Sequence, residues 1–197
     1  MNAVPRAFPN ATIVCLGSGP SLTRADVDYC RGRAVTIAIK ETVRLAPWAD
    51  VFYACDKKFF EHHGDELVTF AGLRFTLDHM AHRWATDLQI GDHTGLSLDP
   101  TTLNTGYSSG FQCINLSVLL GAVRVLLLGY DCQVRNDGPD HWFGSHAWKT
   151  RPPVDLFRPC FSTLVEPLKQ VGVSVINCSR ETALDCFPRM PLREALA

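Results

Sequence analysis

The sequence ATIVCL at Ala11–Leu16, followed directly by GSGPS at 17–21, sets the architecture that we expect. The first six residues form a mainly apolar run with β-branched residues, which is typical of a strand buried on both faces of a parallel sheet. In α/β proteins a glycine-containing turn at the carboxyl end of such a strand commonly faces a ligand crevice and leads into a helix. The segment therefore predicts a strand, a ligand-facing turn and a following helix.

Similar apolar runs recur along the chain and alternate with stretches of helical length. The further strands that we expect are Ala34–Ile39, Val51–Ala54, Leu73–Leu77, Arg124–Leu128 and Val173–Asn177. The helices that we expect are Leu22–Cys30, Lys57–Thr69, Ser109–Leu120, Asp155–Val171 and a short one at Thr182–Cys186. Strands that alternate with helices form a parallel sheet covered on both sides. We therefore predict an α/β fold, a three-layer Rossmann-like parallel sheet with helices on both faces.

Length and composition narrow the class of protein. The chain has 197 residues, which predicts a single domain over residues 1–197. Lys and Arg number 19 against 20 Asp and Glu, so the net charge of -1 disfavours nucleic-acid binding through a basic surface. The amino-terminal residues contain no apolar signal core and no apolar run is long enough to span a bilayer, so we expect a cytoplasmic protein without a transmembrane segment. The eight cysteines form no CxxC pair, and we expect reduced thiols.

Two turns that contain glycine and serine are the first candidates for ligand binding. The glycines of the GSGPS turn let the backbone approach a ligand, and amides at the start of a helix attract phosphate. The turn is either a phosphate- or nucleotide-binding loop or a plain tight turn. The YSSG motif at 107–110 opens an expected helix, so its serines are either caps or ligand contacts. The candidate residues are Gly17, Ser18, Gly19, Pro20, Ser21, Ser108, Ser109 and Gly110.

Polar side chains also follow the last two expected strands. Asp131 ends the GYD motif after Arg124–Leu128, where a carboxylate can bind a ribose, a metal ion or a substrate hydroxyl. A structural Asp that caps the next turn is an equal alternative. Asn177 and Ser179 follow the final strand and are candidates to bind a base or a sugar, although Ser179 can instead cap a turn.

The motif DHWFGSH at 140–146 places two histidines in a polar, glycine-containing segment. Histidine titrates near neutral pH and serves as a general base, so His141 and His146 are candidate catalytic residues. Their spacing is not that of a zinc site, and we expect no metal ion there. The motif lies in a loop-like stretch over residues 133–153, which is long enough to be a lid.

Taken together, these motifs resemble two known families. IVCLGSGPSL at 13–22 is similar to the opening of the bacterial sialyltransferases of glycosyltransferase family 42. It is equally similar to the archaeal 6-hydroxymethylpterin pyrophosphokinase-like family and to related phage and prophage proteins of unassigned role. The resemblance continues in order through the segments 50–60, 108–131, 141–146 and 176–184.

The sialyltransferase resemblance implies a Rossmann-like variant of the GT-A type and a nucleotide-sugar donor, typically activated by CMP. It implies that residues 17–19 wrap the donor phosphate and ribose and that residues 108–110 also contact the donor. It implies that His146 is a general base that deprotonates a hydroxyl of a glycan or small-molecule acceptor, with no cofactor or metal required. The family has Asn where Ser18 and Lys40 stand here, and Lys40 can still bind a phosphate as a point charge. The resemblance also hints at a homo-oligomer.

The pyrophosphokinase resemblance implies a different chemistry. It requires ATP and a divalent metal such as magnesium, which is held by carboxylates and phosphates. The candidate carboxylates are Asp56 and Asp131. A third alternative is a nucleotide-binding module without catalytic activity, which needs the GSGPS turn but no catalytic histidine.

Overall fold

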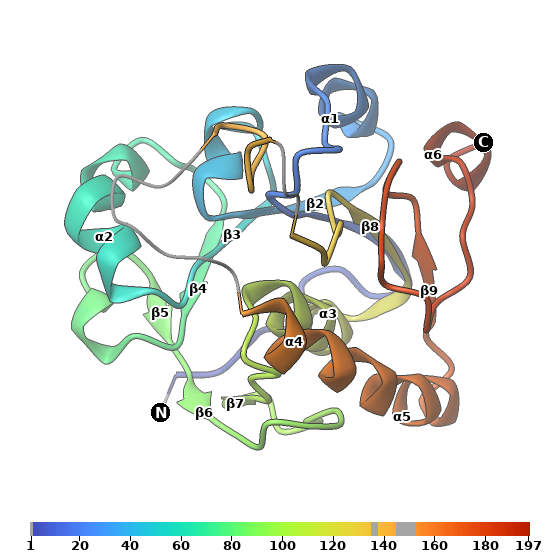
Figure 1. Cartoon of the computed structure of the whole chain (residues 1–197). Coiled ribbons are helices and arrows are strands. Elements are labelled where there is room, and N and C mark those ends of the chain that lie inside the picture. The colour runs from blue at the N-terminus through green and yellow to red at the C-terminus, as the bar shows by residue number, and fades with distance from the viewer. Residues whose placement is uncertain (1, 135–137, 145–152) are drawn as a thin grey trace.

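The computed structural model describes residues 2–134, 138–144 and 153–197. Its centre is a seven-stranded parallel sheet in the order β5-β4-β3-β2-β1-β8-β9 (Figure 1). The strands are β1 (Ala11–Leu16), β2 (Val35–Ile39), β3 (Val51–Tyr53), β4 (Leu73–Thr76), β5 (Thr86–Asp87), β8 (Ala122–Leu128) and β9 (Ser174–Asn177). Two short strands, β6 (Gln89–Ile90) and β7 (Thr102–Leu103), form a second parallel pair.

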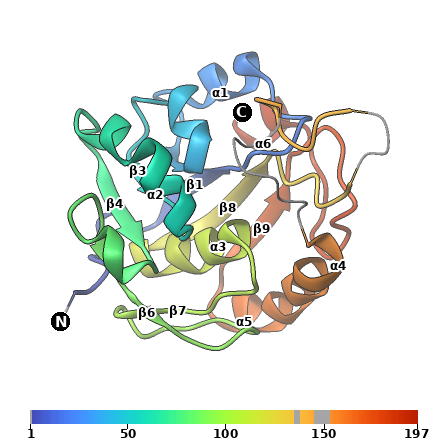
Figure 2. The same ribbon diagram turned by 60° about the vertical axis from the view of Figure 1, so that its left-hand side comes forward.

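Helices cover both faces of the sheet, which confirms the predicted three-layer α/β fold. On one face α3 (Ser109–Leu120), η4 (Arg158–Leu164) and α5 (Val165–Gln170) contribute to one apolar cluster. On the other face α1 (Arg24–Cys30), η1 (Lys40–Arg44), α2 (Lys57–His63) and α6 (Leu192–Ala195) contribute to a second cluster. Figure 2 shows α3 and α5 on one side of the sheet and α1 and α6 on the other.

Strand β1 is buried on both faces because successive side chains alternate between the two clusters. Ile13 and Cys15 belong to the first cluster and Val14 and Leu16 to the second, and all four are fully buried. This explains why the strand reads as a continuous apolar run rather than as an alternating one.

The order of the strands reverses at β1. From β1 the chain continues to β2 on one side, whereas β8 pairs with β1 on the other side and Leu16 lies opposite Leu128. The turns that follow β1 and β8 therefore meet at one point of the carboxyl edge of the sheet. In α/β sheets this switch point is where ligands bind.

The helical segments differ more from the sequence prediction than the strands do. The expected helix Lys57–Thr69 ends as α2 at His63 and continues as the 3₁₀ helix η2 (Gly64–Leu67). The expected helix Asp155–Val171 is divided into α4 (Val154–Phe157), η4 and α5. Pro159 lies in the first turn of η4 and lacks the amide that an uninterrupted α-helix needs there.

The short helix expected at Thr182–Cys186 is absent from the described structure, and that prediction is wrong. The Thr182 hydroxyl accepts from the amide of Leu184 at 3.0 Å and donates to the carbonyl of Tyr130 at 2.7 Å. The amide of Ala183 donates to the carbonyl of Asp131 at 2.8 Å. These bonds satisfy the backbone in a turn instead of a helix.

Two further sequence expectations concern thiols and the membrane. All eight cysteines are free thiols. Among the described residues, none of the helices has the length and apolar character that crossing a membrane requires.

Candidate functional site

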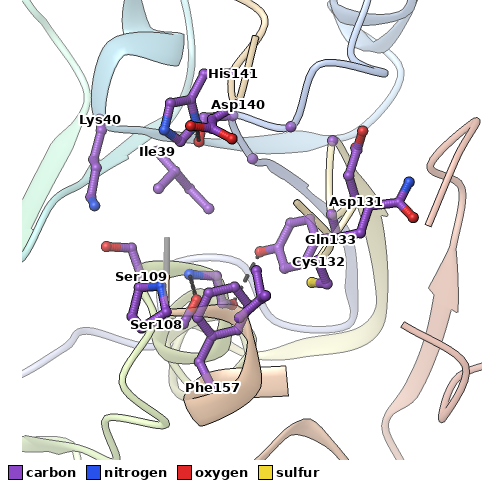
Figure 3. Close-up of a pocket in the computed structure, with 18 of the residues that line it drawn as sticks. Ile39, Lys40, Ser108, Ser109, Asp131, Cys132, Gln133, Asp140, His141 and Phe157 are labelled. Atoms are coloured by element: carbon purple, nitrogen blue, oxygen red, sulfur yellow. Dashed lines mark hydrogen bonds between the residues drawn. The ribbon is translucent and has the colours of Figure 1, made fainter. Parts of the chain in front are cut away.

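A cavity of about 390 Å³ lies at the switch point between β1 and β8. This volume lies within the range of pockets that bind small molecules. The wall includes Gly17–Pro20 after β1, Tyr107–Gly110 at the start of α3, and Gly129–Gln133 after β8. The remaining lining residues are Ile39, Lys40, Cys55, Asp56, Asp140, His141, Pro153, Val154, Phe157 and Phe161. Figure 3 shows Lys40, His141, Ser109 and Phe157 arranged around this space.

The turn after β1 is tied to the turn after β8 by backbone hydrogen bonds. The amide of Gly17 donates to the carbonyl of Leu128 at 2.7 Å, and the amide of Gly19 donates to the carbonyl of Gly129 at 2.9 Å. A Cβ on Gly17 would lie 2.6 Å from the carbonyl oxygen of Gly129, so only glycine permits this approach. Both amides therefore donate hydrogen bonds within the chain, whereas the family resemblance implies that this turn binds the donor phosphate.

Asp131 holds the same turn in place through its side chain. The carboxylate is buried and accepts from the amide of Ser21 at 2.9 Å and from the Ser21 hydroxyl at 2.6 Å. Gly19 packs against it, because a Cβ at this position would overlap the carboxylate. Asp131 contributes to the cavity wall, and these contacts give it a structural role in addition to the predicted catalytic one.

The start of α3 is the part of the wall best suited to an anion. Ser108 caps the helix by accepting from the amide of Gly110 at 3.2 Å. The helix is 12 residues long, and the first-turn amides of such a helix present a partial positive charge. The structure thus brings Ser108, Ser109 and Gly110 together at the cavity, in line with the sequence analysis.

A second group of neighbours extends from this helix start towards β3. The Ser109 hydroxyl lies 3.2 Å from the Cys55 thiol. Burial raises the pKa of the Cys55 thiol to about 11, so the thiol stays neutral at physiological pH. On the other side of the helix start, the buried Tyr130 hydroxyl donates to the carbonyl of Gly110 at 3.1 Å. The helix start is thereby fixed between β3 and β8.

Lys40 and Asp56 follow β2 and β3 and form an ion pair beside the cavity. Burial lowers the pKa of the Lys40 amine, but the surrounding groups, foremost Asp56, together outweigh this effect and raise the pKa. Lys40 is therefore positively charged at physiological pH. Its backbone adopts a left-handed conformation with a φ of 52°, which is uncommon for a side chain of this size.

His141 reaches the cavity because its segment docks on the turn after β1. Its Nδ1 lies 3.2 Å from the Ser18 hydroxyl, and its ring stacks on Phe143 with centroids 4.9 Å apart. The amide of Trp142 donates to the carbonyl of Ser18 at 3.0 Å, and the Trp142 indole donates to Thr42 at 3.1 Å. His146, the other predicted catalytic histidine, lies outside the described residues, as does much of the predicted 133–153 lid.

Asn177 and Ser179 are predicted ligand contacts that the structure does not place in the cavity wall. The Asn177 amide donates to the Thr182 hydroxyl at 3.1 Å, and its oxygen accepts from the amide of Ser179 at 3.0 Å. The Ser179 hydroxyl accepts from the amide of Tyr130 at 2.8 Å. Both buried side chains support the turn after β8 from behind.

Within residues 2–134, 138–144 and 153–197 no three His, Cys, Asp or Glu side chains are grouped so that they could hold a metal ion. The two carboxylates expected for a magnesium site are engaged, Asp56 with Lys40 and Asp131 with Ser21.

The sequence motifs do not predict several of the residues that line the cavity. Phe157 and Phe161 come from the segment after Pro153 and give the cavity an apolar side. The YSSG motif predicts ligand contacts for Ser108, Ser109 and Gly110, although Tyr107 also lines the cavity. One structural signal connects some of these positions: Lys40, Tyr107 and Cys132 line the cavity and adopt positive φ angles of 52°, 54° and 49°.

Comparison of the chain with protein-family models, with curated proteins and with solved structures finds no significant match.

Proposed function

We propose that this protein is a nucleotide-sugar-dependent glycosyltransferase in which the cavity between β1 and β8 binds the donor. One observation carries the proposal: a cation, a helix start and a histidine from three different segments surround one cavity at the switch point. These groups are Lys40, the Ser108–Gly110 turn and His141. The resemblance of the motifs to the bacterial sialyltransferases of glycosyltransferase family 42 suggests CMP as the activating nucleotide.

The donor phosphate would bind between Lys40 and the start of α3. A phosphate oxygen that approaches Lys40 replaces the Asp56 carboxylate as the partner of the ammonium group. The first-turn amides of α3 add donors on the other side. The same positive groups stabilise the charge that collects on the phosphate as the sugar leaves.

The transfer step needs an acceptor hydroxyl and a base. The hydroxyl oxygen attacks the anomeric carbon of the donor, the bond from that carbon to the phosphate oxygen breaks, and the nucleotide leaves with the electron pair. The hydroxyl proton passes to a histidine, which later releases it to solvent. His141 is the candidate within the described residues, and its contacts with Ser18 and Phe143 fix the ring. His146 stays the candidate that the resemblance implies.

The contacts of the two carboxylates favour this proposal over the pyrophosphokinase alternative. A magnesium ion would have to compete with Lys40 for Asp56 and with the Ser21 amide and hydroxyl for Asp131. Donor binding to Lys40 likewise displaces the Asp56 carboxylate, but it leaves the contacts between Asp131 and Ser21 in place.

Nucleotide binding tests the proposal directly. Thermal unfolding is measured with CMP, CDP, UMP, UDP, AMP and ATP, each with EDTA and again with magnesium. A ligand at 100 times its Kd stabilises the fold by about 2.7 kcal/mol. Stabilisation by a nucleotide in EDTA, followed by transfer or hydrolysis of the matching nucleotide sugar, is the expected result. Binding of ATP only with magnesium would favour the pyrophosphokinase, and failure of every nucleotide would overturn both.

The role of the histidines is tested by His141→Ala and His146→Ala, with His62→Ala on α2 as the control outside the cavity. Loss of a general base lowers turnover by about 100- to 10,000-fold while donor binding persists. We expect one of the first two variants to show this pattern and the control to resemble the wild type. Full turnover in both would remove the base from the mechanism. Nucleotide binding without turnover in the wild type would favour the non-catalytic module.

A further inference from the structure

Tyr107 is a partly exposed aromatic residue that lines the cavity. The residue is 44% exposed, and none of the other large apolar residues that are exposed in the described parts of the chain is aromatic. The ring stacks on His93, with centroids 4.2 Å apart and planes inclined by 25°. Tyr107 lines the cavity, whereas His93 is not among the lining residues.

The partner ring is itself held in place. Nδ1 of His93 lies 2.6 Å from the Thr105 hydroxyl, which belongs to the segment that carries Tyr107. The amide of Ser108 donates to the carbonyl of Thr105 at 3.0 Å and closes the turn between them. The two rings therefore form one preformed unit, and a ligand that stacks on Tyr107 does not have to order a flexible side chain first.

The backbone just before α3 has an unusual conformation at two successive residues. Gly106 and Tyr107 are both left-handed, with φ angles of 47° and 54°. Gly106 packs directly against the Phe111 ring, where a Cβ would overlap it. A bulky aromatic residue in a left-handed conformation is strained, and such strain persists at sites where the surrounding structure and the function require it.

We infer that Tyr107, backed by His93, is the stacking platform for the nucleobase of the bound nucleotide. The inference deepens the proposed function and rests on it, because it assigns the base to one side of the same cavity. Tyr107 directly precedes Ser108, so a base stacked on its ring places the attached sugar and phosphate beside the start of α3. Stacking uses the π face that every base has, so the platform binds pyrimidines and purines alike and leaves the choice of base to polar groups.

The test compares CMP with ribose 5-phosphate, which keeps the sugar and phosphate and lacks the base. Isothermal titration calorimetry is performed on the wild type, Tyr107→Ala and Tyr107→Phe. Tyr29→Ala on α1 removes a tyrosine outside the cavity wall and is the matched control. Circular dichroism establishes that each variant is folded.

The expected result is a selective loss. In Tyr107→Ala the affinity for CMP falls by about 10- to 100-fold, as expected for removal of one base–aromatic stack. Affinity for ribose 5-phosphate stays within about twofold of the wild type. Tyr107→Phe keeps the ring and binds CMP like the wild type, as does Tyr29→Ala.

Other outcomes separate this inference from the proposed function. Equal affinity of the wild type and Tyr107→Ala for CMP overturns the platform and leaves the glycosyltransferase proposal standing. An equal loss of affinity for CMP and ribose 5-phosphate also overturns the platform, because it shows damage to the phosphate site. A Tyr107-dependent affinity for CMP without turnover of any nucleotide sugar supports the platform and overturns the transferase. Failure of the wild type to bind CMP or any other nucleotide overturns both.

Discussion

Replacing Asp131 with alanine is expected to destabilise the protein without touching the apolar clusters. The buried carboxylate accepts from the amide and the hydroxyl of Ser21 at 2.9 and 2.6 Å. A hydrogen bond to a charged group contributes about 1.5–3 kcal/mol, and a buried amide left without a partner costs about 1–3 kcal/mol. Because removal of the carboxylate also removes the cost of burying its charge, we expect a net loss of about 2–4 kcal/mol.

The assay is equilibrium unfolding in urea, followed by circular dichroism, with thermal unfolding in parallel. For a chain of this length 1 kcal/mol shifts Tm by about 2–4 °C, so Asp131→Ala should lower Tm by about 4–16 °C. Asp131→Asn keeps one acceptor and should lose less. Asp185→Ala removes an exposed carboxylate and should stay within about 0.5 kcal/mol of the wild type.

A double-mutant cycle with Ser21→Ala separates this contact from general damage. Residues that share a hydrogen bond couple by about 0.5–3 kcal/mol. Unfolding of Asp131→Ala at the wild-type urea concentration, or additive effects of Asp131→Ala and Ser21→Ala, would refute the structural role. If Asp131→Asn keeps its stability and loses nucleotide binding, then Asp131 contacts the ligand directly.

Three further predictions concern other contacts of the structure. Gly17→Ala places a Cβ against the carbonyl oxygen of the residue just after β8, so the free energy of unfolding in urea should fall by about 1–3 kcal/mol. Wild-type stability of this variant would show that the two turns can move apart freely. Lys40→Met should weaken CMP binding by about 10- to 100-fold and reduce the salt dependence of that binding in calorimetry. Lys57→Met, at an exposed lysine, should change neither the affinity nor its salt dependence. Equal affinity of the two variants for CMP would show that Lys40 does not bind the phosphate. Burial opposes the charged form of Asp26, but the hydrogen bond from Arg180 lowers the pKa of Asp26. The ion pair therefore stabilises the protein above about pH 4, and this stabilisation is lost as pH falls through the lowered pKa of the folded state. Arg180→Met should therefore lose about 1 kcal/mol or less at pH 7, and this loss should shrink as pH falls through the lowered pKa of Asp26. A loss that does not change with pH would contradict the assignment.

The strands could be predicted because each buried strand is a short, continuous apolar run in the sequence. ATIVCL becomes β1 with the predicted bounds, and the strands expected at 34–39 and 173–177 begin only one residue later. The helical segments were less predictable, because proline and side-chain hydrogen bonds divide them. Pro159 lies in the first turn of η4, where the α-helix has ended, and the Thr182 hydroxyl holds a turn where a helix was expected.

The candidate site was predictable in its position and less so in its contacts. The sheet order brings Ser18, Lys40, Ser108 and His141 to one cavity, as the placement of each after a strand or before a helix indicated. A sequence does not show which partner a polar group takes. The sequence therefore predicts Asn177 as a ligand contact, although its side-chain amide donates a hydrogen bond to Thr182.

The place of β1 in the middle of the sheet has a consequence for synthesis of the chain. One edge of β1 pairs with β2 soon after both emerge, but the other edge pairs with β8, which follows about one hundred residues later. At roughly 5–20 residues per second, that edge waits about 5–20 s on the ribosome. An unpaired apolar edge strand is a template for association with other chains. The nascent amino-terminal half should therefore depend on chaperones until β8 arrives, and a chain truncated before residue 122 should aggregate.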